Sequence, residues 1–305
     1  MISICIPIYN YDVAALVNEL NSQAKQASVP FEIVLIDDCS TEAFKALNKE
    51  LCNKHNYIQL DKNMGRARIR NRFLEYAKYD HLLFLDCDSL IISETFIADY
   101  VKYISQNKVY NVVCGGRIYD KAQPKRNKML RWKYGIKRES QSAKIRKLSP
   151  NKSFMTNNFL MERWVFDKVK FDERIVEYGH EDTLFGYELM KNNISIGHIE
   201  NPVLNGDVED NDEYLQKTEN GIVNLVQILH YLDDDPEFVR NVSLLDYFEK
   251  IKSKHFLWFI KLKYLFWGPI IRYFLVKGFV NLWLFDFYKL GFLSQHLKGD
   301  KPSRV

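Results

Sequence analysis

The chain has 305 residues, of which 47% are hydrophobic and 27% are charged. This composition is typical of a globular protein and excludes a disordered chain, and the length allows one large domain with a smaller appendage. The formal net charge of +4 is unevenly distributed, because residues 240–305 carry 12 Lys and Arg against 4 Asp and Glu. The rest of the chain is therefore net acidic.

The cysteines and the N-terminal sequence indicate the cellular compartment in which the protein folds. The five cysteines form no C-x-x-C pair, and three of them lie in or beside apolar runs, so we expect reduced, mostly buried thiols and a cytosolic setting. They are Cys5, Cys39, Cys52, Cys87 and Cys114. The opening "MISICIPIYN" lacks the basic start of a signal peptide and predicts a strand. No window reaches about 18 uncharged apolar residues, so no transmembrane helix is expected.

The first half of the chain alternates short apolar runs with amphipathic stretches, which is typical of βαβ units around a mainly parallel sheet. The apolar runs are almost continuous, as expected of strands that are buried on both faces. Strands are predicted at 2–8, 31–37, 57–60, 81–86 and 109–116. Helices are predicted at 13–27, 42–54, 66–78 and 93–106.

The second half begins with a basic segment, 117–147, which has 12 Lys and Arg against Asp120 and Glu139 and predicts a long loop or a partly ordered insert. Strands are expected at 153–161 and 194–199, with a helix starting near His180 between them and an acidic, then helical, stretch after the second. Beyond Pro236 the chain is helical and rich in aromatic residues to about Leu293, and Gly268-Pro269 predicts a break into two helices. We expect an α/β domain at 1–235, with the insert at 117–150, and a C-terminal helical region at 236–305.

Acidic residues follow several of the predicted strands. Asp37-Asp38 ends the second strand, Asp86-Cys87-Asp88 ends the fourth, and Glu181-Asp182 opens a later helix. Ligands of open α/β sheets bind beyond the carboxyl ends of the strands, so these acids are expected to meet at one rim. The end of the first strand brings Pro7, Tyr9 and Asn10 to the same place.

The D-x-D triplet is the most informative of these groups. In an extended segment, Asp86 and Asp88 point to the same side, because side chains alternate with period two. Two carboxylates that are completed by substrate phosphates suit Mg²⁺ or Mn²⁺. The alternative is that Asp88 or Ser89 caps the next helix.

The other polar groups each have two interpretations. Asp37-Asp38 is either a turn or a contact to a nucleoside, and Glu181-Asp182 is either a first-turn pair favoured by the helix dipole or a source of a general base. In "NMGRARIRN", Arg66 and Arg70 share one helical face, which is either a solvated face or a diphosphate contact.

In this order, the motifs "SICIPIYNY", "IVLIDDCST", "NMGRARIRN", "LLFLDCDSL", "TNNFLMER", "FDERIVEYGHEDTLFGYEL" and "HIENPV" resemble the family 2 glycosyltransferases with the GT-A fold. The resemblance covers about residues 1–235, and within the family the chain is most similar to bacterial enzymes that build surface polysaccharides. It implies a Rossmann-like α/β domain that moves a sugar, with inversion, from a nucleotide-diphosphate donor, usually a UDP-sugar, to a hydroxyl of a saccharide or a lipid-linked acceptor.

The resemblance also implies roles for individual residues. The donor would contact Pro7, Tyr9, Asp38, Arg70, Asp86, Asn157 and Asn158. Asp88, with Asp86, would hold Mn²⁺ or Mg²⁺. Asp182 would be the general base, supported by Glu181. Two features depart from the family pattern, since Asn205 stands where relatives often carry His and Cys87 is the middle residue of the D-x-D.

The basic insert and the aromatic tail suggest partners. The insert, with Tyr119, Trp132 and Tyr134, resembles a nucleic-acid surface, but its place within a sugar-nucleotide site favours a lid or a grip on a phosphate-bearing acceptor, so no nucleic acid is expected. Residues 255–293 interleave bulky aromatics with Lys and Arg, which favours peripheral membrane contact on the inner face of the plasma membrane. A helical subdomain or a homodimer interface is the alternative.

Other functions fit less well. A hydrolase also uses two carboxylates but needs no D-x-D beside a nucleotide-type rim. A nucleotidyltransferase would show a Gly-rich opening after the first strand, which the sequence lacks. A non-catalytic, membrane-associated protein that binds nucleotide sugars with the same fold remains the alternative from another class.

Overall fold

A computed structural model describes residues 1–106, 109–175, 178–206, 208–251 and 254–297, although the side chains of Cys52 and of residues 254–257 are outside this description. The predictions for Cys52, for 298–305 and for the start of the aromatic tail therefore lie partly or wholly outside the described residues. The chain forms two compact units. The first comprises the described residues of 1–120, 138–176 and 181–207, and the second comprises those of 121–137, 177–180 and 208–305.

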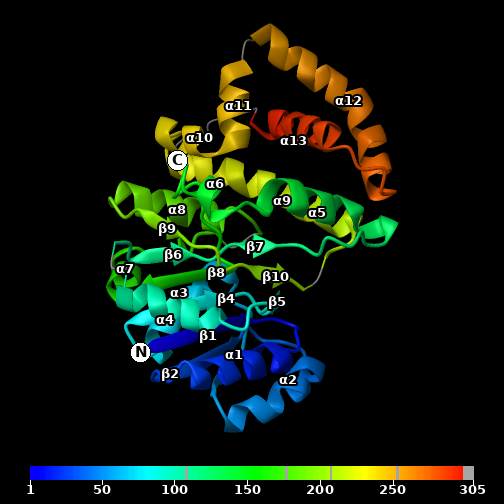
Figure 1. Cartoon of the computed structure of the whole chain (residues 1–305). Helices are drawn as coiled ribbons and strands as arrows, with labels where there is room; N and C mark the ends of the chain where they lie inside the picture. The colour runs from blue at the N-terminus through cyan, green and yellow to red at the C-terminus, as the bar shows by residue number, and fades with distance from the viewer. Residues whose placement is uncertain (107–108, 176–177, 207, 252–253, 298–305) are drawn as a thin grey trace. The chain divides into compact units, whose positions relative to one another are not determined.

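A seven-stranded sheet forms the centre of the first unit, with strand order β3-β2-β1-β4-β8-β6-β9 (Figure 1). Its strands are β1 (Ile2–Ile8), β2 (Phe31–Asp37), β3 (Asn56–Gln59), β4 (His81–Leu85), β6 (Val112–Cys114), β8 (Asn158–Glu162) and β9 (Ile196–His198). Four neighbouring pairs are parallel, and only β8 runs antiparallel to its neighbours β4 and β6. The predicted α/β class with a mainly parallel sheet is confirmed.

The helices of this unit pack on both faces of the sheet. On one face, α1 (Ala14–Gln26) and α4 (Phe96–Gln106) contribute Leu20 and Tyr100 to a core with Ile4 of β1. On the other face, α3 (Arg66–Tyr76), α7 (Arg163–Lys168) and α8 (Glu181–Lys191) join a core that includes Phe84 of β4. Successive strand residues enter opposite cores, which explains the continuous apolar runs in the sequence.

Three further groups of elements complete the first unit and the insert. A small sheet has the order β5-β10-β7, with β5 (Ser89–Leu90), β7 (Arg117–Ile118) and β10 (Val203–Asn205). α2 (Glu42–Asn48) continues into the 3₁₀ helix η1 (Lys49–Asn53). The insert contains η2 (Arg126–Lys128), α5 (Met129–Tyr134), η3 (Gly135–Glu139) and α6 (Ala143–Arg146).

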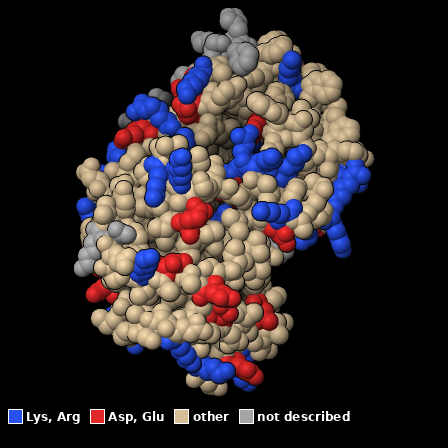
Figure 2. Space-filling view, viewed as in Figure 1, with Lys and Arg blue, Asp and Glu red and all other residues tan. Residues whose placement is uncertain are grey.

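The second unit is helical and contains α5 with α9 (Asn211–Tyr231), α10 (Pro236–Asn241), α11 (Ser243–Ile251), α12 (Lys254–Val276) and α13 (Leu282–His296). Its core includes Leu130, Leu215, Leu275 and Phe285. In the same view as Figure 1, Figure 2 shows mostly uncharged surface, interrupted by Lys and Arg, where α12 lies. None of the helices in the described parts of the chain is long and apolar enough to cross a membrane.

Of the two alternatives for the insert, the partly ordered form fits and the long loop does not, because apolar residues such as Leu130 are buried and stabilise short helices despite the surrounding charge. One expectation about local structure is wrong, since the chain does not break at Gly268-Pro269 and Pro269 lies inside α12. The carbonyl that loses its donor there, four residues earlier, belongs to Leu265, a residue on the exposed side of α12.

The break occurs instead at Gly278, which has a φ of +80°. Phe279 N donates to Phe274 O at 2.9 Å and Gly278 N donates to Leu275 O at 3.0 Å, which is the Schellman pattern of a helix C-terminus. Asn281 then caps α13, because its side chain accepts hydrogen bonds from the N–H groups of the first turn. The domain boundary expected at 235 stays a prediction.

Candidate active site

The carboxyl ends of β2, β1 and β4 lie side by side at one edge of the sheet of the first unit. In the β1–β2 register Ile8 pairs with Asp37, and β1 is also parallel to β4. Pro7 is half-buried near the end of β1, and Tyr9, just beyond it, is 54% exposed. The first three groups of predicted site residues therefore meet at this edge, as the topology rule requires.

Asp37 and Asp38 are buried, and their carboxylates bind the polypeptide itself. Asp37 accepts hydrogen bonds from Ser40 N at 2.7 Å and from the Tyr57 hydroxyl at 2.7 Å. Asp38 accepts from Met64 N at 2.6 Å and from Gly65 N at 3.0 Å. Burial raises the pKa of Asp38, and the two backbone N–H groups oppose that rise. Asp38 thus ties the end of β2 to the start of α3.

The arginines of α3 lie on defined faces of a helix whose first turn follows Gly65. Gly65, with a φ of +82°, precedes the first turn, a conformation that glycine adopts without strain. Arg66 and Arg70 share a helix face as predicted, since both lie within 4.0 Å of Glu181 Oε1. Arg68 lies on a different face, where its Nε is 3.9 Å from Glu173.

The Asp86 carboxylate lies between two guanidinium groups. Arg70 Nη2 donates to its Oδ1 at 2.9 Å, and Arg117 Nη2 donates to its Oδ2 at 3.4 Å. Arg70 is only 3% exposed, and its Nε has no hydrogen-bond partner within the described residues. The buried guanidinium of Arg70 therefore lies beside the Asp86 and Glu181 carboxylates and keeps one unused donor.

Asp86-Cys87-Asp88 is a turn and not the extended segment that was expected. Ser89 N donates to Asp86 O at 3.1 Å, and β5 follows before any helix begins, so neither Asp88 nor Ser89 caps α4. The Asp88 carbonyl accepts from Gly206 N at 3.0 Å, next to Asn205, which pairs with Ser89. Cys87 packs against the core and burial raises the pKa of its thiol to about 12, so the thiol stays protonated.

Glu181 and Asp182 occupy the first turn of α8. Burial, followed by the neighbouring Glu181 carboxylate, raises the pKa of Asp182 to about 6. Hydrogen bonds from Thr183 and the positive charge of Arg70 act in the opposite direction. Desolvation therefore exceeds the helix-dipole effect that the sequence suggested, and Asp182 has a proton affinity suited to a general base near neutral pH.

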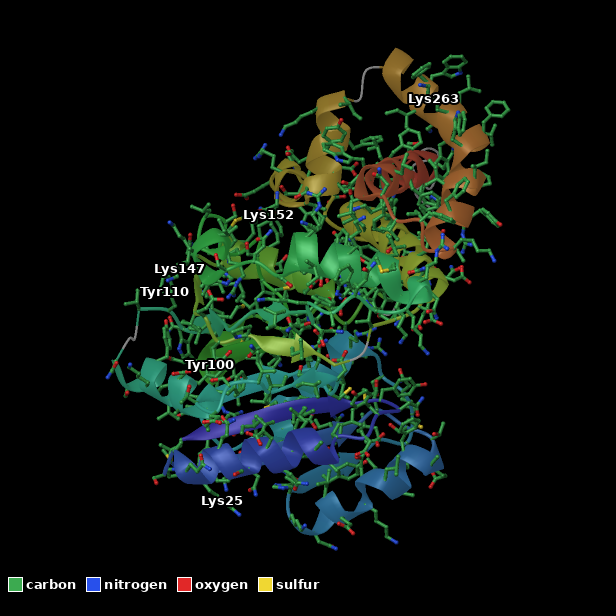
Figure 3. The ribbon with its side chains drawn as sticks, turned by 45° about the vertical axis from the view of Figure 1, so that its right-hand side comes forward. Lys25, Tyr100, Tyr110, Lys147, Lys152 and Lys263 are labelled. Atoms are coloured by element: carbon green, nitrogen blue, oxygen red, sulfur yellow. The ribbon has the colours of Figure 1, made fainter. Side chains whose placement is uncertain are left out.

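Asn157 and Asn158 are both buried but differ in their contacts. The Asn158 side chain accepts from the Tyr100 hydroxyl at 2.6 Å and donates to Gly116 O and Asn201 O at 3.1 and 2.8 Å (Figure 3 labels Tyr100). The backbone carbonyl of Asn157 accepts a hydrogen bond from the backbone N–H of Asp86 at 3.2 Å, while its side-chain Nδ2 is buried without a partner in the described chain. Asn158 thus holds loops of the fold together, and Asn157 has a donor to spare beside Asp86.

Arg117 and Arg146 are functional candidates that the sequence did not identify, because each is one of the 12 basic residues of the insert. Arg117 contacts Asp86 and lies 3.8 Å from Glu139. Arg146 is buried, and its guanidinium donates to four carbonyls, Gln141 O, Cys114 O, Gly115 O and Ile199 O. Arg146 thus fixes the strand end that leads into Arg117.

The predicted metal site depends on the carboxylates of the D-x-D turn. No group of three His, Cys, Asp or Glu side chains in the described part of the chain is placed to hold a metal ion. Mg²⁺ and Mn²⁺ bind through as few as one or two carboxylates plus substrate phosphates, so this donor set still fits them. The two guanidiniums on Asp86 oppose a cation there, so Asp88 is the better candidate ligand.

Comparisons with known proteins agree with this geometry. The model of the family described as "Glycosyl transferase family 2" matches residues 3–169. The chain is 25% identical over 224 residues to the chondroitin synthase of Escherichia coli, a match that covers 62% of this chain and 32% of that protein. It is 34% identical over 110 residues to the poly(ribitol-phosphate) beta-N-acetylglucosaminyltransferase TarS of Staphylococcus aureus, which covers 34% of this chain and 19% of TarS. The matches thus span about a third or less of these relatives.

Solved structures show the same fold. The mannosyltransferase PcManGT of Pyrobaculum calidifontis superposes with a TM-score of 0.59 at 12% identity, covering 99% of this chain and 88% of that one. TarS residues 1–349 superpose with a TM-score of 0.53 at 18% identity, covering 95% and 90%. The fold is therefore GT-A, and the family model spans more than half of the chain. This protein belongs to glycosyltransferase family 2.

Proposed function

We propose that the chain transfers a sugar, with inversion, from a nucleotide-diphosphate donor of the UDP-sugar type to a hydroxyl of a saccharide or lipid-linked acceptor in cell-surface polysaccharide synthesis. The observation that carries this proposal is the group formed by Asp86, Arg70, Glu181 and Asp182, in which a carboxyl with a pKa raised to about 6 lies beside a buried guanidinium. A base and an anion-binding group in one place are what such a transfer needs.

Asp182 is the proposed base and Glu181 supports it. The acceptor hydroxyl forms its bond to the anomeric carbon from the face opposite the diphosphate, while the bond from that carbon to the diphosphate oxygen breaks. Asp182 takes the hydroxyl proton, and the nucleoside diphosphate leaves with the bonding electron pair. A single displacement needs no enzyme nucleophile and inverts the configuration. Glu181 raises the pKa of Asp182, which strengthens it as a base.

The donor is assigned to the rim of the sheet. The exposed ring of Tyr9 and the half-buried Pro7 frame the nucleoside, and Asp38 is the proposed contact to the base, with its lone pairs beyond those used by Met64 and Gly65. Asn157 is the proposed contact on the sugar side, and Asn158 supports that side by holding the neighbouring loops together. The TarS structure with UDP-GlcNAc supports a UDP donor. The PcManGT structure holds GDP-Man, so a GDP-sugar is the competing donor that the experiment must include.

The diphosphate is assigned to Arg70 and to Asp88, which would hold Mn²⁺ or Mg²⁺ with Asp86 behind it. When bound, the divalent cation neutralises charge on the leaving diphosphate. Arg70 is already aligned by Asp86, so it needs no reorganisation as negative charge builds up on the leaving group. The PcManGT structure holds Mn²⁺, which supports this cofactor class.

The proposal also assigns the domain bounds and the cellular location of the protein. We place the transferase domain at 1–235 and the helical region at 236–305. The reaction is assigned to the cytoplasm, at the inner face of the plasma membrane, and the free thiols of Cys5, Cys39, Cys87 and Cys114 support a reducing compartment.

The test combines binding with turnover. A panel of UDP- and GDP-sugars is screened by thermal shift with Mn²⁺, since a bound ligand raises the melting temperature, and release of nucleoside diphosphate is then measured with saccharide acceptors. Asp88→Ala is expected to abolish turnover and the Mn²⁺-dependent shift while the fold survives. Chelation by EDTA should have the same effect on the unmodified chain. Donor binding without release under any condition would instead support a non-catalytic nucleotide-sugar-binding protein.

A further inference from the structure

Helix α12 is apolar on two sides, although only one of them is packed. Ile260, Ile271 and Leu275 are buried, and two of these belong to the core of the second unit. The other side is exposed and carries large apolar residues at spacings of three and four. These are Trp258, Leu262, Leu265, Phe266, Ile270 and Tyr273, with exposures from 39% to 66%.

The exposed side continues beyond α12. Phe279 in the connection is 56% exposed, and Trp283 and Leu284 at the start of α13 are 82% and 45% exposed. A helix with one buried face normally turns charged and polar residues to water, and contiguous exposed apolar surface marks an interaction site. The packed core of the second unit does not need these side chains, so they require another partner.

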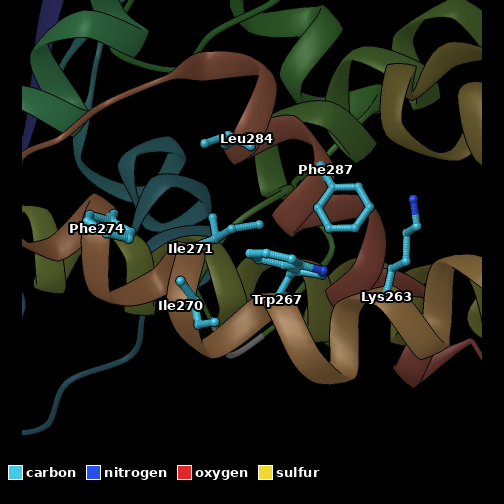
Figure 4. Close-up of a pocket in the computed structure, with 7 residues that line it drawn as sticks. All are labelled: Lys263, Trp267, Ile270, Ile271, Phe274, Leu284 and Phe287. Atoms are coloured by element: carbon cyan, nitrogen blue, oxygen red, sulfur yellow. The ribbon is translucent and has the colours of Figure 1, made fainter.

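A groove between α12 and α13 opens within this surface. Its volume is about 400 Å³, and it is lined by Lys263, Trp267, Ile270, Ile271, Phe274, Leu284 and Phe287. The rings of Trp267 and Phe287 and the side chains of Ile271 and Leu284 point into it, while Lys263 stands at one end (Figure 4). An apolar groove with a single cation at its end suits a hydrocarbon chain that carries an anionic group.

The charge of this region is one-sided. Residues 254–297 contain six Lys and Arg against the single acid Asp286. Arg272 and Lys289 are ion-paired, the first with Asp212 and Glu219 and the second with Asp286. Lys263 and Lys277, in contrast, lie over the rings of Phe259 and Tyr273 and form no ion pair within the described residues. These two lysines keep their charge for an external anion.

We propose that the exposed side of α12, with the start of α13, docks on an anionic phospholipid surface, and that the groove accepts part of one lipid chain with Lys263 beside its phosphate. The aromatic and basic mixture is typical of helices that lie in the membrane interface, and no described helix can span the bilayer. The docking goes beyond the transfer reaction and depends on none of its steps. It would hold the protein next to lipid-linked acceptors.

The charge argues against a second copy of the chain as the occupant. In a two-fold dimer the same patch faces itself, so Lys263 and Lys277 of the two copies would approach like charges with Asp286 already paired. An anionic lipid surface has the complementary charge, and each Lys near such a surface contributes about 1 kcal/mol, which is about fivefold in affinity.

The test is flotation of the full chain with vesicles of phosphatidylcholine alone and of phosphatidylcholine with phosphatidylglycerol, without donor or acceptor. The chain should float with the anionic vesicles and release as salt rises. The double variant Lys263→Gln, Lys277→Gln should weaken binding roughly thirtyfold. The matched control Lys152→Gln, which changes an exposed lysine of the first unit (Figure 3), should bind like the unmodified chain.

The groove has its own readout in tryptophan fluorescence. Phosphatidylglycerol with brominated acyl chains should quench the unmodified chain, and Trp267→Phe should lose much of that quenching, whereas the control Trp164→Phe should not. The charge assignment would be overturned if the double variant Lys263→Gln, Lys277→Gln bound anionic vesicles as well as the control Lys152→Gln does. It would also be overturned if the unmodified chain bound neutral and anionic vesicles equally. Concentration-dependent dimers in sedimentation with no vesicle binding would overturn the whole proposal. If the chain floats with anionic vesicles but transfers no sugar, only the proposed function is rejected.

Discussion

Replacement of the proposed base should make the protein more stable as it makes it inactive. Burial raises the pKa of Asp182 from 3.8 to about 6, so the folded state holds this proton more tightly than the unfolded state does. Stability from the protonated carboxyl is fully present below pH 3.8 and is lost as the pH rises through about 6. At pH 7.5 the ionised carboxylate is therefore a cost to folding.

The magnitude follows from the shift. Each pKa unit corresponds to 1.36 kcal/mol, so a rise of roughly two units gives an upper bound of about 3 kcal/mol. Asp182→Asn removes the ionisation and keeps an oxygen that can accept from Thr183 N, which donates to Asp182 at 2.7 Å. We expect this variant to gain about 1–3 kcal/mol at pH 7.5, which is several degrees in melting temperature for a chain of this size.

The assay is a comparison of melting temperatures of the variant and the unmodified chain from pH 4 to pH 8. The gain should be near zero at pH 4 and reach its full size above pH 6.5. Transfer should fall by roughly two to four orders of magnitude while the donor still raises the melting temperature. A variant no more stable than the unmodified chain at pH 7.5, or a gain that does not change with pH, would refute the reasoning about burial.

Three further outcomes are expected. The rate should fall about tenfold per pH unit below pH 6 and be flat above it, as pH–rate measurements under saturating donor will show, since Asp182 must be ionised. Arg70→Met should raise the pH of that fall, because Arg70 lowers the pKa of Asp182, and should cost about 3–5 kcal/mol in unfolding experiments, whereas the exposed Arg68→Met costs under about 0.5 kcal/mol. Arg117→Gln should reduce kcat more than tenfold without a change in melting temperature above about 3 °C, and Lys144→Gln, an exposed change in the same insert, should be silent in both assays.

The sequence predicts well what depends on local pattern and on the topology rule for parallel sheets. The strands at 2–8 and 31–37 appear with those bounds, and the polar residues at the ends of β1, β2 and β4 lie at one edge. These predictions succeed because a strand buried on both faces has an unmistakable apolar run, and because the topology rule brings the carboxyl ends of neighbouring parallel strands to one edge of the sheet.

The sequence fails where a contact joins distant segments without a periodic signal. Arg117 and Asp86 are 31 positions apart, and nothing distinguishes Arg117 from its basic neighbours before the fold brings it to the D-x-D turn. The predicted position of the break between the C-terminal helices is wrong for a related reason. Gly268-Pro269 is a strong local signal, but packing of α12 against α13 outweighs it, and the hydrogen bonds around Gly278 end the helix ten residues later.

The D-x-D turn shows what the structure adds to a motif. The two aspartates are alike in sequence, yet Asp86 is held by Arg70 and Arg117, while the Asp88 carbonyl is anchored by Gly206. A carboxylate between two guanidiniums has little negative charge left for a cation, but it holds both arginines in place for a phosphate group. We therefore propose that the motif divides into two tasks, in which Asp86 holds Arg70 and Arg117 in place for the diphosphate and Asp88 is the candidate ligand of a divalent ion.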